Sequence, residues 1–139
     1  MRSNLSAINV YNKKNIKSKV VTQLLYGDIF KKLGQSGSWI KIKNNSDNYK
    51  GYIKNKKFPS NHKSTHKICV LRSNLYSKPN VRNKIFKKLS FGSKIKVTNR
   101  KGNFYKFESL WIMKKDLKKI NFKRKDNFKN IISFIIYFF

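Results

Sequence analysis

The chain offers one candidate for nucleophilic chemistry, the thiol of Cys69, which follows His66 in the stretch "HKICVLR". A catalytic cysteine needs a neighbouring base and a lowered pKa. The stretch is expected to be one extended strand, in which residues three apart point to opposite faces, so the imidazole would face away from the thiol. Because free cysteines are mostly buried, we interpret Cys69 as a structural thiol and predict no catalytic residue.

The other ionisable residues give no support for a metal or cofactor site. Cys69 is the single cysteine, and His62 and His66 are the two histidines, so a multi-cysteine zinc site is excluded and no further histidine completes a metal site. We predict no metal and no cofactor. Paired-carboxylate catalysis also lacks support, because the acidic residues form no close pair: they are Asp28, Asp47, Glu108, Asp116 and Asp126.

Aromatic side chains suggest binding rather than catalysis. A tyrosine has an apolar ring and a polar end, which suits a half-exposed groove. Aromatic platforms are a common means of binding extended peptides. Trp39 fits either a groove or the core, whereas we assign Trp111 to the core. The predicted peptide-binding candidates are Tyr26, Trp39, Tyr49 and Tyr52.

The charge of the chain is strongly basic, with 34 Lys+Arg against 5 Asp+Glu and a formal net charge of +29. Such a field attracts polyanions, nucleic acid among them. Only five of the basic residues are arginine, the residue that makes bidentate contacts to bases and phosphates. Lys, Asn, Ile, Phe and Tyr share A+T-rich codons, so a biased genome produces the same profile. We favour this compositional interpretation and keep a selected basic surface as the alternative.

The chain also contains a repeated pattern. The segment that starts at Val10 aligns without a gap with the segment that starts at Leu75, at an offset of 65. The rarer matched residues carry most weight. They pair Tyr11 with Tyr76, Gly27 with Gly92, Gly37 with Gly102, and Trp39 with Phe104. Further on, the second copy is six residues shorter, so that Tyr52 aligns with Trp111 at an offset of 59. We infer a duplication.

Each copy contains about five short apolar or alternating runs that predict strands. In the first copy they are "SAINVY", "KVVTQLLYG", "DIFKKL", "SWIKIK" and "YKGYIK". β-branched and aromatic residues dominate them, and Gly37-Ser38 is the expected turn between the third and fourth runs. Short strands in this number suggest a small barrel, because closure protects the strand edges. The sequence therefore predicts an all-β chain of two tandem small barrels.

The ordered stretches "VTQLLYGD", "DNYKGYI", "STHKICVLRSNLYSKP" and "LSFGSKIKV" resemble bacterial SH3-like domains. More closely, the chain is similar to the tandem SH3-like region of NlpC-type cell-wall cysteine peptidases of the dipeptidyl-peptidase-like kind, over about residues 10–120. The resemblance implies two SH3-like barrels and an enzyme that cuts wall peptides after γ-D-glutamyl residues. It also implies a location in the cell envelope, although no signal peptide is visible.

The chain departs from this family after the second barrel. "KDNFKNIISFII" is similar to the opening helix of the catalytic domain, but the cysteine and histidine segment that should follow is not in the sequence. The apolar run "IISFIIYFF" is far shorter than the roughly 20 residues needed to span a bilayer. We therefore expect no transmembrane span. The expected organisation is a first domain 1–58, a linker 59–66, a second domain 67–120, and a short helical or disordered tail 121–139 of a truncated peptidase domain.

Two functions remain open from the sequence. The first is a non-catalytic wall-binding or targeting module, the N-terminal part of a truncated or split γ-D-glutamyl-diamino-acid endopeptidase. Its partners would be a cell-wall peptide or a peptidase catalytic domain, with non-specific binding of polyanions in addition. The alternative is a basic nucleic-acid-binding protein built on SH3-like barrels, whose affinity would fall steeply with salt. The resemblance favours the first.

Overall fold

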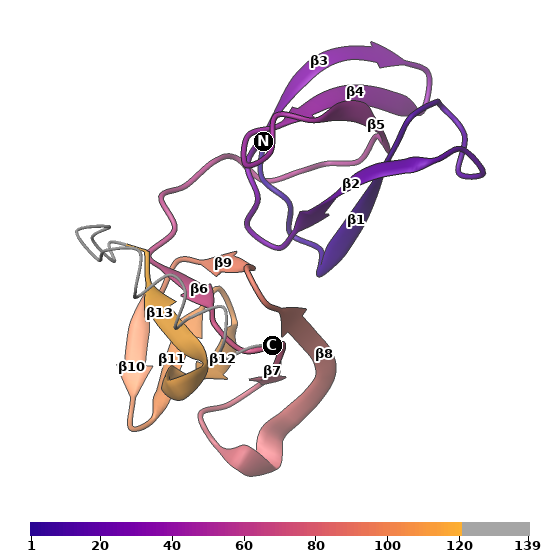
Figure 1. Cartoon of the computed structure of the whole chain (residues 1–139). Helices are drawn as coiled ribbons and strands as arrows, with labels where there is room; N and C mark the ends of the chain where they lie inside the picture. The colour runs from indigo at the N-terminus through magenta and orange to yellow at the C-terminus, as the bar shows by residue number, and fades with distance from the viewer. Residues whose placement is uncertain (121–139) are drawn as a thin grey trace, which may run out of the picture. The chain divides into compact units, whose positions relative to one another are not determined.

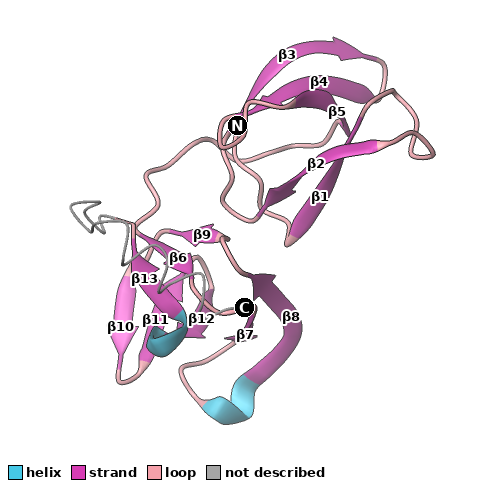
Figure 2. Cartoon of the chain, in the orientation of Figure 1, coloured by secondary structure: helices cyan, strands magenta, loops and turns pink. Residues whose placement is uncertain are grey.

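A computed structural model describes residues 1–120, and β-strands account for the regular structure there apart from two short 3-10 turns (Figure 2). The predicted all-β fold class is therefore confirmed. The predicted tail, 121–139, lies outside the described residues. The chain divides into two compact units, of which the first is Met1–Lys63 and the second begins at Ser64.

The first unit contains a five-stranded antiparallel sheet in the order β2-β1-β5-β4-β3 (Figure 1). All five of its strands overlap the apolar runs of the sequence. The turn at Gly37-Ser38 follows the pair Ser36–Trp39, as expected from the sequence. The strands are β1 (Ala7–Tyr11), β2 (Val20–Leu25), β3 (Phe30–Ser36), β4 (Trp39–Asn44) and β5 (Lys50–Lys54).

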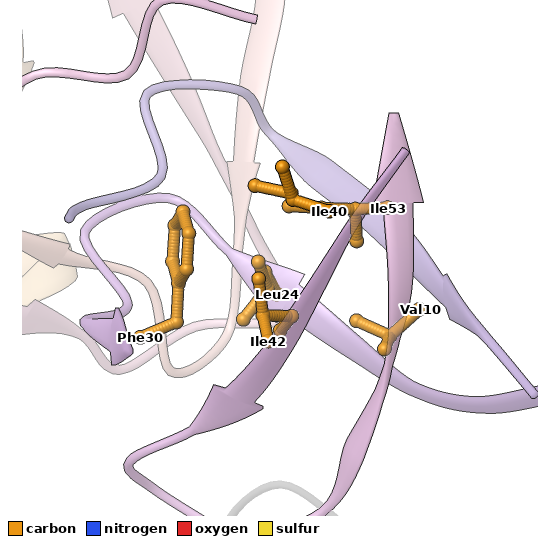
Figure 3. Packing of buried hydrophobic residues seen from close by; sticks show 6 residues of the cluster. All are labelled: Val10, Leu24, Phe30, Ile40, Ile42 and Ile53. Atoms are coloured by element: carbon orange, nitrogen blue, oxygen red, sulfur yellow. The ribbon is translucent and has the colours of Figure 1, made fainter. Parts of the chain in front are cut away.

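The core of the first unit lies on one face of these strands. Six apolar side chains meet there, each at most 1% exposed: Val10, Leu24, Phe30, Ile40, Ile42 and Ile53 (Figure 3). Successive side chains of a strand point to opposite faces, so the residues between them on β4 and β5 point away from the core. Phe58, beyond the last strand, packs its ring edge-on against Phe30 with centroids 5.1 Å apart.

The second unit repeats this arrangement. Its larger sheet has the order β8-β7-β12-β11-β10, which matches the first sheet strand for strand, and a smaller sheet has the order β13-β6-β9. Two 3-10 turns, η1 (Val81–Asn83) and η2 (Lys114–Asp116), precede β8 and β13. The strands are β6 (His66–Ile68), β7 (Arg72–Tyr76), β8 (Lys84–Ser90), β9 (Lys94–Ile95), β10 (Asn99–Lys101), β11 (Phe104–Phe107), β12 (Leu110–Met113) and β13 (Leu117–Lys119).

The offset of 65 is visible in backbone geometry as well as in sequence. Gly27 has a φ of 84° and Gly92 a φ of 89°, a left-handed conformation that favours glycine. The N–H of Gly27 donates to the carbonyl of Ser3 at 2.9 Å, and the N–H of Gly92 donates to the carbonyl of Ile68 at 3.0 Å. The two donors are 65 residues apart, and so are the two acceptors. The turn that follows β2 is therefore equivalent to the turn that follows β8.

The first residues of the chain close the first unit. The N–H of Phe30 donates to the carbonyl of Met1 at 3.0 Å, and the N–H of Arg2 donates to the carbonyl of Pro59 at 3.1 Å. Residues 1–3 thus take the place that β6 has in the second unit. The repeat is detectable in the sequence only from Val10 onward, because the backbone hydrogen bonds of residues 1–3 place no demand on residue type.

Candidate peptide-binding site

Three aromatic residues lie together on the face of the first sheet that points away from the core. They are Tyr11 on β1, Trp39 on β4 and Tyr52 on β5, and we call them the first aromatic cluster. Tyr11 lies directly opposite Tyr52 across the β1–β5 pair, and Trp39 lies opposite Lys54. Residues directly opposite in antiparallel strands have side chains in contact range. Strand register therefore assembles the cluster from segments up to 41 residues apart in the sequence.

Two lysine side chains lie over rings of the first aromatic cluster. The Trp39 and Tyr11 rings meet edge to face with centroids 6.1 Å apart. The ammonium of Lys54 lies 4.4 Å from the centre of the Trp39 ring, and that of Lys14 lies 5.9 Å from the centre of the Tyr52 ring. Both distances are within the range of cation–π attraction. The surface thus combines aromatic edges with positive charges.

The second unit has an equivalent set, the second aromatic cluster: Tyr76 on β7, Phe104 on β11 and Trp111 on β12. The Tyr76 and Phe104 rings also meet edge to face, with centroids 5.1 Å apart, and Tyr76 lies opposite Trp111. Lys106 lies over Trp111 with its ammonium 5.8 Å from the ring centre. Each position is related to the first aromatic cluster by the sequence offsets of 65 or 59.

The two clusters differ in how much of the ring surface reaches solvent. In the first, Tyr11 and Tyr52 are both half-buried, while Trp39 is 9% exposed. In the second, Tyr76 is 5% exposed, and Trp111 alone is half-buried. The first cluster is therefore the better candidate for contact with a ligand.

The sequence-predicted site residues fall into three places. Trp39 and Tyr52 belong to the first aromatic cluster. Tyr49 lies in the turn before β5 and is 58% exposed. Tyr26 is 3% exposed, so its ring packs inside the unit rather than beside Trp39 and Tyr52. Tyr11 was not predicted, although its match with Tyr76 in the repeat was a signal that could have drawn attention to it.

The prediction that "HKICVLR" forms one extended strand is wrong, because β6 ends at Ile68 and Cys69 lies in the connection to β7. Cys69 and His66 make separate contacts in the second unit. Cys69 is a free thiol that is 5% exposed, and burial raises its pKa. The His66 ring packs against Tyr105 with centroids 5.3 Å apart, and its Nδ1 lies 2.8 Å from the hydroxyl of Thr65. Burial, followed by the charges of Lys119 and Arg100, lowers the pKa of His66. A thiol with a raised pKa is a poor nucleophile.

We expect Cys69 to react with a thiol reagent roughly 100-fold more slowly in the folded chain than in the chain unfolded in urea, because the reagent must wait for local opening. Mass spectrometry of samples quenched over time measures both rates. Equal rates would contradict the burial of the thiol.

Two further observations concern residues 1–120. Within this range no three His, Cys, Asp or Glu side chains come close enough together to hold a metal ion. A search of the same part of the chain for a helix with the length and apolar character of a membrane span found none.

Comparison with known proteins gives two likenesses. Residues 6–58 match the family described as the bacterial SH3 domain. The fold resembles a solved structure titled an NlpC/P60 family protein from Bacillus cereus ATCC 10987, with a TM-score of 0.68 and 14% sequence identity. That likeness covers 85% of this chain and 55% of the solved one, so the chain spans about half the length of the structure it matches. The search of curated proteins returned no match.

The likenesses confirm the predicted SH3-like architecture. The bacterial SH3 match lies within the first unit, and the likeness to the solved structure extends over most of both units. The resemblance drawn from the sequence motifs, to the SH3-like region of NlpC-type proteins, agrees with both findings.

Proposed function

We propose that this chain, whose first unit matches the bacterial SH3 domain and whose fold is shared with an NlpC/P60 family protein, is a module that binds a cell-wall peptide. In this proposal the module binds rather than hydrolyses, and it brings a peptidase catalytic domain to its substrate. The resemblance to the SH3-like region of γ-D-glutamyl-diamino-acid peptidases supports this role for both units.

One observation carries the proposal: two half-buried tyrosines, Tyr11 and Tyr52, lie directly opposite each other on the outer face of the sheet. Peptide methyl groups would contact the edges of these rings. The ammonium groups of Lys14 and Lys54, already held over aromatic rings, would meet the carboxylates of the peptide. Apolar and charged contacts at one surface suit a short acidic peptide.

We expect Tyr52→Thr to weaken binding to purified peptidoglycan sacculi about tenfold or more, equivalent to ~1.4 kcal/mol. Threonine keeps the preference for a strand while it removes the ring. Co-sedimentation across a salt titration, with sacculi freed of phosphate polymers, measures the loss. A comparable thermal unfolding curve shows that the variant is folded.

Tyr49→Thr is the matched control, because Tyr49 is the same residue type in the same unit but lies outside the first aromatic cluster. It should bind as the unchanged chain does. An equal loss in both variants would contradict the assignment of binding to the cluster. Binding that disappears at moderate salt and moves wholly to added DNA would contradict the wall-binding function and favour the nucleic-acid alternative.

A further inference from the structure

The hairpin between β4 and β5 is longer than its counterpart in the second unit. In the second unit the hairpin turns directly after the pair Phe107–Leu110. The first unit has one further cross-strand pair before its turn, Lys43–Lys50. The six additional residues of the first copy therefore extend the sheet by a pair of lysines and a turn.

This added pair completes a line of three lysines across adjacent strands. Lys31 on β3 lies opposite Lys43 on β4, which in turn lies opposite Lys50 on β5. We call these residues the lysine row. Directly opposite side chains have Cβ atoms about 5 Å apart, and like charges in that position repel. Because Lys50 and Tyr52 are two residues apart on β5, the row shares the outer face with the first aromatic cluster.

Within residues 1–120 the lysine row has no carboxylate partner. Asp47 is the acidic residue of this hairpin, but its carboxylate accepts hydrogen bonds from other groups: the hydroxyl of Thr22, the side-chain amide of Asn44 and the backbone N–H of Tyr49. These bonds hold the Asp47 carboxylate within the turn, so it does not form an ion pair with a lysine of the row. An anion bound along the row would relieve the repulsion between its lysines.

We propose that the lysine row binds successive phosphate groups of a linear phosphodiester polymer, beside the peptide-binding surface. Three compact ammonium charges in a line suit anions in series, and lysine binds phosphate as a point charge without the planar geometry of arginine. This inference rests on the proposed function in that the row continues the face on which the peptide would bind. It assigns that face a second, phosphate-bearing ligand.

The surroundings of the row favour a polymer without bases. Nucleic-acid bases bind protein surfaces by stacking on open aromatic faces. Lysine ammonium groups already lie over the rings of Trp39 and Tyr52, the aromatic residues on the same face. A polymer that binds through its phosphates alone leaves these contacts in place.

The test compares two triple variants of the full chain that carry the same change of net charge. The first, Lys31→Gln with Lys43→Gln and Lys50→Gln, removes the row. The second removes three exposed lysines of the other unit: Lys78→Gln, Lys101→Gln and Lys115→Gln. The probe is a synthetic glycerol phosphate oligomer, and fluorescence anisotropy gives its binding constant across a range of salt concentrations.

We expect the row variant to lower the slope of log binding constant against log salt by about 2, since each phosphate contact contributes about 0.7. The control variant should change the slope much less. Equal changes in both variants would overturn the inference, because net charge alone would then explain binding. Tighter binding of polyglutamate than of the phosphate oligomer would also overturn it. So would tighter binding of oligothymidine than of the phosphate oligomer, if Tyr52→Thr further weakens the binding of oligothymidine.

The two functions can fail separately. Sacculi freed of phosphate polymers should bind the row variant as they bind the control variant, while Tyr52→Thr loses that binding. Loss of phosphate binding in the row variant alone, with peptide binding absent from every variant, would support the lysine row and contradict the proposed function.

Discussion

Replacing Gly51 by alanine should destabilise the first unit by about 1–3 kcal/mol or more, because the added methyl group has no room. A Cβ at this position would lie 2.6 Å from Cγ1 of Val10 and 2.7 Å from the backbone oxygen of Tyr11. The valine methyl can turn aside, but the backbone oxygen belongs to β1 and moves only with the strand. Urea unfolding, with hydrogen exchange of the β1 and β5 amides as the reporter of the first unit, measures the change.

Gly34→Ala is the matched control for this substitution. Gly34 lies on β3, where an added Cβ would meet no atom within 4 Å. Its free energy of unfolding should stay within about 0.5 kcal/mol of that of the unchanged chain. A cost equal to that of Gly51→Ala would show that loss of glycine, rather than the close approach of β1 to β5, sets the effect.

Replacing Phe30 by alanine should lower the free energy of unfolding of the first unit by about 3–5 kcal/mol. The ring is 1% exposed and packs against Phe58, so its removal leaves a cavity between β3 and the segment that follows β5. Domains have only 5–15 kcal/mol of stability in general, so this loss is a large fraction of the total. Thermal unfolding and the exchange rates of the β1–β5 amides measure it.

Phe86→Ala is the control, since it removes the same side chain from a fully exposed position on β8. The expected change is within about 0.5 kcal/mol. If Phe86→Ala costs as much as Phe30→Ala, burial is not the cause, and the account of the first core is wrong.

The strands could be predicted because their side chains alternate between the core and solvent. In "SWIKIK" the isoleucines recur at every second residue, and the structure buries them while Lys41 between them is exposed. The repeat was visible because its glycines occupy conformations that other residues adopt at a cost. Gly37 and Gly102, for example, have φ values of 58° and 57°.

The site was less predictable, because it depends on which strands lie next to each other. Nothing in the local sequence around Tyr11 shows that it will lie opposite Tyr52, since that pairing joins β1 to β5. The burial of Tyr26 follows in the same way from tertiary packing. An abundance of lysine across the chain also hides the three that register brings into line, which are Lys31, Lys43 and Lys50.

The closure of the first unit by residues 1–3 has a consequence for the order in which the unit forms. Arg2 bonds through its backbone N–H to the carbonyl of Pro59 and through Nε to that of Ser60, at the other end of the unit. On the ribosome, Arg2 emerges before Pro59 and Ser60 and must therefore wait for them before these bonds exist. Contacts of such sequence separation slow folding, typically to milliseconds or seconds. We therefore expect completion of the unit to follow the formation of its hairpins.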